Sequence, residues 1–447
     1  MATRQALTGV CFVALQRLQP SDGSSQSSGG KAGATCSATK ELHETLRLRW
    51  LGMAAKIQQR NQMMNEECVA VTKQLVHDGL SCCVLKGQGN IPGYGLWMMD
   101  DGSESESLGM YRTPGDIDVW CWPQVDSLST SSGQAVSSPT ECGIEIAVSD
   151  LDPSTGSGQV QGAHGVYPEG TRRKHYSGAR GVIEYALMQA RVAGNPVPEV
   201  RYNHVELPNV WKADVEIHHR PAFLCSPVRN CRLQRWLRDN EQFGLHDAKI
   251  GDCIIPTPTV SFNAVYQLTH IYRHLFDEGV GLRQLLDYYF VLRALHVEQG
   301  SLQDRTRSMA QWAEGMGLSV ASNIEIMHQL RSFGLAKFAG AVMCVLREVF
   351  GMPEQYMICP ANEKEGRFLL DEIMMAGNFG AFDQRIRRDY RLRINDYRLS
   401  LPRGMVHAIE KTKHNMRLVR HYPEEVMWEP FFRVYHWMWR RFELWRY

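Results

Sequence analysis

The chain has 447 residues, of which 44% are hydrophobic and 22% charged, and its 49 basic and 48 acidic residues give a formal net charge of +1. These proportions are typical of a globular protein of about three domains, and they exclude wholesale disorder and a polytopic membrane protein. The balanced charge excludes recruitment of nucleic acid or anionic lipid by the molecule as a whole.

Two further observations bear on the cellular compartment of the protein. The twelve cysteines include no CxxC pair and no regular disulfide framework, which favours a reducing cytosol. The apolar stretch from Val10 to Leu18 is too short to span a bilayer, and no cleavage site marks it as a signal peptide. We therefore expect a cytoplasmic protein without a transmembrane segment.

The first 39 residues are expected to form a flexible segment. Ser and Gly make up more than half of the stretch from Ser21 to Ala38, which leaves little apolar surface to bury. Beyond it, apolar residues fall at 46, 50, 53, 57, 64, 68, 71 and 75. Spacings of three, four and seven predict one face of a long helix, with Leu46 among the residues that face a core. This helix opens the first domain, which we place at 40–240.

Three short segments of this domain have the composition of strands. They are residues 82–85, 117–122 and 213–218, the last of which alternates polar and apolar residues with the period of a strand. Two polar stretches, 100–109 and 124–162, are expected to be solvated insertions between the strands.

The second half of the chain has a helical pattern. Candidate helices, punctuated by Gly and Pro, lie near 261–277, 281–296, 305–316, 322–332, 335–350 and 364–375. We therefore expect residues 241–447 to form an all-helical domain.

A pair of carboxylates is predicted on the second strand, in the sequence Gly115-Asp116-Ile117-Asp118. Alternate residues of a strand point to the same side, so the two carboxylates would aim at one point, about 6–7 Å apart along the strand. Such a pair attracts an oxygen-preferring cation such as Mg²⁺, because uncompensated carboxylates repel each other. The alternative is a solvated strand end that carries two acidic residues.

A glycine-bearing turn follows the first strand, in Leu85-Lys86-Gly87-Gln88-Gly89. Glycine lets backbone N–H groups approach a phosphate, and a lysine adds a point charge. A phosphate site beside a metal site indicates phosphoryl chemistry, although neither a Walker loop nor the G-x-G-x-x-G fingerprint is present. The alternative for these glycines is an ordinary turn.

Six segments then occur in order along the chain: LKGQGN, YRTPGDIDVW, DVEIHHRP, HIYRHLFDEGVGLRQLLDYYFVL, GNFG and YPEEVMWEP. Together they resemble the uncharacterised bacterial nucleotidyltransferase family of the DNA polymerase beta superfamily, from about residue 40 to the last residue. The resemblance implies an α+β fold, with a small mixed sheet and flanking helices as a polymerase-beta-like nucleotidyltransferase core before the helical half. It also implies Mg²⁺-dependent transfer of a nucleoside monophosphate from an NTP to an unidentified acceptor, with release of pyrophosphate.

The resemblance also assigns roles to residues. Lys86 and Gly87 would lie beside the triphosphate, and Asp116 and Asp118 would bind Mg²⁺. Glu216 would be the third acid, so that two ions bridge the three carboxylates and the phosphates. This third acid would help to activate the acceptor hydroxyl for in-line attack on the α-phosphorus.

Three more residues are candidates for this site. Asp214 is the runner-up for the third acid, and His218 lies on the same face of the strand as Glu216. Arg112 could neutralise charge on the phosphates, since it precedes Asp116 by four residues; its alternative is a surface arginine.

Two features depart from the superfamily pattern. Twenty-eight residues separate Gly87 from Asp116, which exceeds the usual short spacing, and Gln88 stands where a second glycine or serine is usual. A non-catalytic, nucleotide-binding interaction protein is therefore the alternative function.

Two pairs of residues in the helical half are spaced by four. His270 and His274 could hold zinc, but no third ligand is evident, so packing or substrate-facing histidines are favoured. For Arg283 and Asp287 a structural ion pair is favoured over contact with a base.

The end of the chain is basic and then aromatic. Residues 384–420 contain eleven Lys or Arg against three Asp or Glu. This segment could bind RNA through residues such as Arg387, Arg388 and Arg391, although a solvated or internally paired face is favoured. For the aromatic tail from Trp428 to Tyr447, a docked helix is the first interpretation and an interfacial membrane anchor the second.

Overall fold

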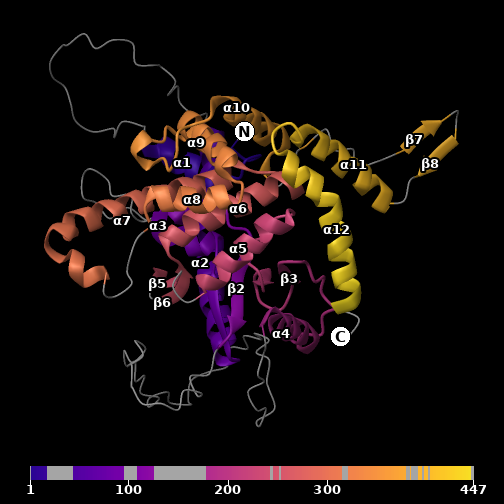
Figure 1. Cartoon of the computed structure of the whole chain (residues 1–447), viewed down its shortest axis with the longest axis horizontal. Coiled ribbons are helices and arrows are strands. Elements are labelled where there is room, and N and C mark those ends of the chain that lie inside the picture. Colours follow the sequence, from indigo (N-terminus) through magenta and orange to yellow (C-terminus); the bar gives the residue numbers. More distant parts are fainter. Residues whose placement is uncertain are drawn as a thin grey trace.

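The structure is a computed structural model, which describes residues 2–17, 44–94, 108–124, 178–241, 245–250, 253–314, 321–378, 383, 391–394, 397–400 and 403–443. The first half contains α1 (Thr8–Arg17), α2 (Glu44–His77), β1 (Leu80–Val84), η1 (Gly87–Asn90), α3 (Ile91–Tyr94), η2 (Leu108–Tyr111), β2 (Ile117–Pro123), α4 (Gly178–Val192), β3 (His204–Leu207), β4 (Val215–His218) and α5 (Pro227–Asp239). The second half contains β5 (Leu245–Ile250), β6 (Cys253–Pro258), α6 (Val260–Asp277), α7 (Leu282–Glu314), α8 (Asn323–Ser332), α9 (Ala336–Phe350), η3 (Glu354–Tyr356), α10 (Glu363–Ala376), β7 (Arg391–Ile394), β8 (Tyr397–Ser400), α11 (Arg403–Leu418) and α12 (Pro423–Glu443). Figure 1 shows this arrangement.

A four-stranded mixed sheet forms the centre of the first half. Its strands lie in the order β1-β2-β4-β3, in which β2 and β4 are parallel and the other neighbours are antiparallel. The three predicted strands correspond to β1, β2 and β4, whereas β3 and α4 were not predicted. The expected mixed α+β core with flanking helices is present.

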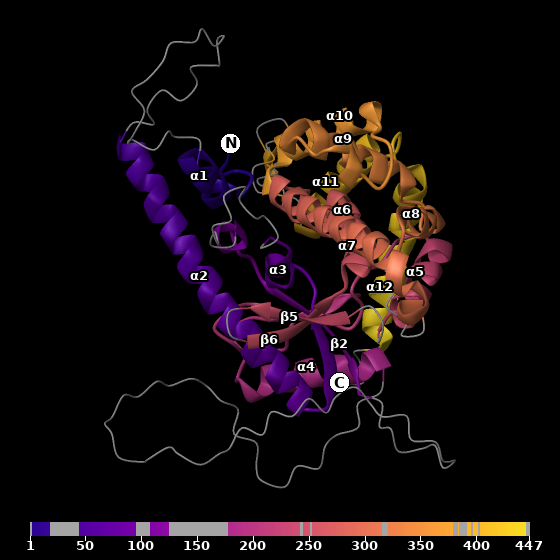
Figure 2. The ribbon, with the colours of Figure 1, turned by 90° about the vertical axis from the view of Figure 1, so that its left-hand side faces the viewer.

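Helices α2 and α4 cover one face of this sheet, and Figure 2 shows α2 along one side of the molecule. The apolar stripe of α2 is buried only toward its C-terminal end, at Met64, Cys68, Val71 and Leu75. The expectation that Leu46 faces a core is wrong, because its side chain is 40% exposed where the helix extends past the sheet.

The other face of the sheet packs against the second half of the chain. Trp120 of β2 is buried and stacks on Phe262 of α6, with ring centroids 5.7 Å apart. Phe262 also stacks on Trp236 of α5, at 4.9 Å. Asp118 of β2 and His218 of β4 are therefore buried between the sheet and α6.

The second half is mostly helical but not all-helical. The antiparallel hairpin β5–β6 lies at its start and β7–β8 is a second hairpin, so the expectation for residues 241–447 is wrong there. Buried Ile250 and Ile255 of β5 and β6 join the core of the sheet, which explains why this segment pairs as strands. The predicted helices 281–296 and 305–316 form one helix, α7.

The N-terminal region also differs from the flexible segment expected for residues 1–39. Residues 2–17 include α1, whose Phe12 and Val13 are buried. The Gln5 side chain donates to the carbonyl of Ile373 and accepts from the amide of Leu282. These contacts hold the segment on α7 and α10. The Ser/Gly-rich stretch lies outside the described residues.

Helix α12 packs on the first half of the chain. Phe432 stacks on Phe223 at 4.9 Å and meets the edge of Tyr202 at the same distance. Glu425 accepts hydrogen bonds from the amide of Cys225 and from Arg273. The docked helix expected for the aromatic tail is therefore present over the described part of that tail.

Candidate active site

Parallel pairing of β2 and β4 brings the predicted acids together. Asp118 lies opposite Glu216 in the register of the two strands, and Asp116 lies just before β2. Ligand oxygens of these three carboxylates lie within 4.8 Å of one another. Asp214 is exposed and precedes β4, so Glu216 is the better placed third acid.

Sequence reasoning missed two further polar residues on this face. Glu206 of β3 lies opposite Glu216, and His204 lies opposite His218. The row Asp118, Glu216, Glu206 thus crosses three strands. The alternation of His204, Val205 and Glu206 was the available signal, but the strand has only four residues.

Lys86 and His218 neutralise the buried carboxylate of Asp118. The Lys86 Nζ lies 3.2 Å from Asp118 Oδ1, and the His218 Nε2 lies 3.0 Å from the same oxygen. His218 Nε2 is also 3.2 Å from Glu216 Oε2. Both Asp118 and His218 have side chains only 1% exposed. The acids therefore meet two cationic groups inside the protein.

The pKa values reflect this arrangement. Burial opposes ionisation of Asp118, but the neighbouring Lys86 and the hydrogen bond from His218 hold the pKa of its carboxyl well below the usual value. Burial raises the pKa of Glu216, and the charge of Asp118 adds to this effect. Burial disfavours the imidazolium form of His218, yet its bonds to Asp118 and Glu216 raise the pKa to about 9.

The glycine-bearing turn lies beside these carboxylates. Gly87 has a φ of +61°, which favours glycine, and a Cβ added there would come 3.8 Å from the carbonyl oxygen of Asp116. A Cβ on Gly89 would lie 2.3 Å from the carbonyl oxygen of Val84, so only glycine fits. The turn is therefore tightly constrained, and the space next to Gly87 borders the acids.

Arg112 does not lie as expected for a phosphate ligand. Its Nε and Nη2 each donate to one carboxylate oxygen of Asp287 at 2.7 Å, and both side chains are buried. Asp287 also accepts a short hydrogen bond from the hydroxyl of Tyr94. Arg283 donates to the carbonyl of Thr113 at 2.8 Å. The buried ion-pair partner of Asp287 is thus Arg112, from a distant part of the sequence.

The two histidines of α6 extend the polar network away from the acids. His270 Nε2 accepts from Lys86 Nζ at 3.0 Å and lies 2.8 Å from His274 Nε2. Burial and the Lys86 charge hold the pKa of His270 well below its usual value. His274 continues the chain to Glu278, at 3.5 Å. These contacts agree with the substrate-facing or packing interpretation.

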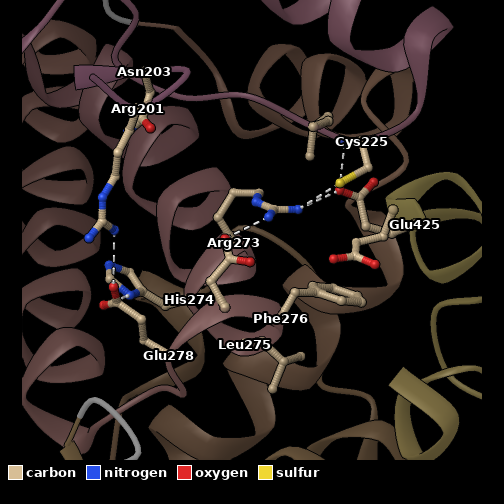
Figure 3. Close-up of polar contacts among 12 residues, drawn as sticks. Arg201, Asn203, Cys225, Arg273, His274, Leu275, Phe276, Glu278 and Glu425 are labelled. Carbon is tan, nitrogen blue, oxygen red and sulfur yellow. Dashed lines mark hydrogen bonds and ion pairs between the residues drawn. The ribbon is translucent and has the colours of Figure 1, made fainter. Parts of the chain in front are cut away.

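A cavity of about 740 Å³ opens next to the carboxylates. Its walls come from the sheet, α6, the segment before β3, and α11 and α12. In Figure 3, Arg273 points toward Cys225 and Glu425, while Arg201 points toward His274 and Glu278. Ion pairs between elements far apart in the sequence thus hold the walls together.

The residues around this cavity fit a divalent metal ion. Three carboxylates converge, and Lys86 shows that a cation is tolerated against Asp118. Oxygen donors of this kind suit Mg²⁺. A second group of potential ligands, His204, Glu216 and His218, shares one carboxylate with the first. The buried Nδ1 of His218 has no hydrogen-bond partner among the described residues.

Residues 167–323 match the model of an uncharacterised nucleotidyltransferase family. The match confirms the resemblance expected from the sequence, and it covers about a third of the chain, including Glu216, His218 and His270. Asp116, Asp118 and Lys86 precede the matched region. No curated protein and no solved structure matches the chain.

Several expectations concern residues that lie wholly or partly outside the described structure. Residues 100–107 and 125–162 of the polar insertions, and Arg387 and Arg388 of the basic segment, lie outside it. Within the segment, Lys411 pairs with Asp277 and Arg417 with Glu372, as expected of an internally paired face. No described helix combines the length and apolar composition that a membrane crossing requires.

Proposed function

We propose that the chain is a nucleotidyltransferase that moves a nucleoside monophosphate from an NTP to an acceptor hydroxyl, with Mg²⁺ as the metal. The observation that carries this proposal is the convergence of Asp116, Asp118 and Glu216 within 4.8 Å, with Asp116 and Glu216 on the wall of a cavity. The match to a nucleotidyltransferase family over the region that contains Glu216 supports it.

The residues of the site have separate tasks. Asp116, Asp118 and Glu216 hold the metal, which when bound offsets the charge of the phosphate oxygens. The turn at Gly87 lets the triphosphate approach the backbone, and the Lys86 ammonium moves from Asp118 to the phosphates. The sheet and α6 limit access of water to Asp118, which strengthens these electrostatic interactions.

The chemical step follows from this placement. The acceptor oxygen attacks the α-phosphorus in line with the bond to the β-phosphate oxygen. Glu216 takes the proton of the acceptor hydroxyl, a new P–O bond forms, and pyrophosphate leaves with the electron pair of the broken bond. His218 keeps the Glu216 carboxylate oriented through its 3.2 Å contact.

A pair of neighbouring carboxylates offers a matched test of the third acid. We expect Glu216→Gln to lower transfer by about 10²–10⁴-fold, the usual contribution of a general base. Asp214→Asn changes an exposed acid two residues away and should leave transfer within about twofold. The assay measures Mg²⁺-dependent incorporation of label from each α-³²P-NTP into fractions of cell lysate. Equal activity of both variants would refute the role of Glu216.

The non-catalytic alternative has one observation in its favour. The Lys86 ammonium lies between Asp118 and His270, at 3.2 and 3.0 Å, and already neutralises the carboxylate. Binding of NTP without turnover, for all four nucleotides, would support this alternative.

A further inference from the structure

The outer face of α12 is apolar. Side chains of the whole stretch 427–442 are described, and the exposed positions are Met427, Trp428, Pro430, Phe431, Val434, Tyr435, Trp437, Met438, Arg441 and Phe442. Arg441 is the only charged residue among them. Phe431, Trp437 and Phe442 are 67%, 66% and 71% exposed. A soluble protein rarely exposes so large an apolar patch on one helix unless the patch has a partner.

The inner face of α12 is already occupied. Phe432 stacks on Phe223, and Trp439 meets Tyr202 with ring centroids 6.0 Å apart. Buried Glu429 accepts a hydrogen bond from Asn415 of α11. Because these contacts fix the rotation of the helix, its apolar outer face cannot turn toward the core.

The width of the apolar stripe argues against a second helix as the partner. Met427, Phe431, Val434 and Met438 follow the four-three spacing of a coiled-coil seam. A coiled coil flanks that narrow seam with charged residues. Here the flanks are aromatic, at Trp428, Tyr435 and Phe442. Such a broad stripe suits an extended apolar medium better than a single helix.

The chemistry of the face matches a lipid surface. Trp and Tyr combine an apolar ring with a polar group and are favoured at the boundary between lipid headgroups and acyl chains. The charge on the face is positive, at Arg441, and the adjoining segment 384–420 carries eight more basic than acidic residues, of which Lys411 and Arg417 are paired within the protein. The neighbouring α11 adds exposed Met416, and exposed Val419 and the exposed cation Arg420 follow its last residue.

We propose that the outer face of α12 binds an anionic membrane surface. The helix lies in the plane of the interface, with its apolar side chains at the boundary between headgroups and acyl chains and Arg441 near the lipid phosphates. Its inner face stays on the protein, so the helix rests on the bilayer without crossing it. At 1.5 Å per residue, the stretch 427–442 presents about 24 Å of apolar length to the lipid.

The exposed apolar face and the cavity lie on different sides of α12. Phe432, Arg433, His436 and Arg440 of α12 line the cavity, whereas none of the exposed residues of the helix does. Binding to a membrane would therefore place the cavity next to the lipid surface. The proposal does not depend on the transferase activity, since it rests on the exposed face and on the basic and apolar residues that adjoin it.

Flotation of the full chain with lipid vesicles tests the proposal. The probe is vesicles of phosphatidylcholine and phosphatidylglycerol in equal amounts, compared with phosphatidylcholine alone. The test variant is Phe431→Ser with Trp437→Ser and Phe442→Ser, none of which lines the cavity. The matched control, Val197→Ser with Val228→Ser and Ile324→Ser, removes three other exposed apolar side chains.

We expect the wild type and the control to float with anionic vesicles, more weakly at high salt. The test variant should lose about a hundredfold or more in apparent affinity, because three large side chains no longer enter the lipid. Circular dichroism should show that both variants are folded. Failure of the wild type to bind anionic vesicles would overturn the proposal, and so would equal binding by the test variant. A third result would show instead that the face joins two copies of the chain: the wild type and the control form dimers, the test variant is a monomer, and none of them binds vesicles.

Discussion

Two buried carboxylates, Asp118 and Asp287, have their charge compensated in different ways. The carboxylate of Asp287 accepts hydrogen bonds from Nε and Nη2 of Arg112 and from the hydroxyl of Tyr94. These partners are all protein groups that are held in place. Asp118 pairs with His218 of the neighbouring strand and with the ammonium of Lys86, which lies on a turn beside a cavity. The comparison teaches that a fully satisfied carboxylate serves the fold, whereas one next to a cavity can exchange its counter-ion for a substrate or metal.

The largest expected effect is a loss of activity, and it distinguishes the surroundings of Asp118 from those of Asp287. Asp116→Asn combined with Asp118→Asn should lower nucleotide transfer by about a thousandfold or more, because a metal contributes several kcal/mol to the transition state. The free energy of unfolding should also fall, because Lys86 and His218 lose the buried carboxylate that pairs with them. Transfer of label and urea unfolding of the same preparation measure the two quantities. Intact transfer in this variant would refute the proposed mechanism.

The second effect concerns stability. Arg112→Met leaves Asp287 buried without its partner and should lower the free energy of unfolding by about 3–5 kcal/mol. Replacing both, as Arg112→Met with Asp287→Leu, should restore most of this loss, since a buried pair can be exchanged for apolar residues at little net expense. Urea unfolding checks both variants. A stable Arg112→Met protein with weakened NTP binding would instead support the phosphate role first expected of Arg112.

A smaller effect is expected at the hydroxyl of Tyr94. Tyr94→Phe removes one hydrogen bond to a charged group and should cost about 1.5–3 kcal/mol of stability. Thermal and urea unfolding measure this loss. Tyr289→Phe alters a half-buried tyrosine of α7 and is the control. If the control cost as much, the Asp287 network would not be the cause.

A third buried carboxylate, Glu365, extends the comparison, because its contribution to stability depends on pH. Burial opposes its ionisation, but bonds from His421 at 2.8 Å and Lys337 at 3.0 Å lower the pKa of its carboxyl. A lowered pKa in the folded state means that its stabilisation is present above the unfolded pKa, near 4.3, and is lost as the pH falls.

Wild-type protein should therefore lose more stability between neutral pH and about pH 4 than Glu365→Gln. Urea unfolding at the two pH values measures the difference, and Glu354→Gln, at an exposed position, is the control. Parallel losses in wild type and Glu365→Gln would contradict the assignment.

Local patterns were sufficient to predict much of the site. The alternation in β2 and β4 predicted that Asp116 and Asp118 share one side of their strand and that Glu216 and His218 share one side of theirs. The register of the two parallel strands places Asp118 opposite Glu216, on the same face of the sheet. The glycine turn was predicted from composition, and Gly89 is where close approach of the Val84 carbonyl excludes a side chain.

Contacts between distant segments could not be predicted in this way. Arg112 lies four residues before Asp116 in the sequence, which suggested a phosphate role, but its partner comes from α7, 175 residues away. Asp287 was paired with Arg283 because they are four residues apart on one helix, a rule that ignores other elements. No periodicity within a single segment indicates which helix will pack against it.

The pairing of β1 with β2 has a consequence for the order of folding. These strands are close in sequence and antiparallel, and their pairing brings Lys86 to Asp118. Nearby segments meet sooner than distant ones, because closing a short loop loses less entropy. The carboxylate is thus expected to acquire its counter-charge before β4 arrives and excludes the remaining water. The later negative charge of Glu216 then arrives together with His218 of the same strand, which contacts both Asp118 and Glu216.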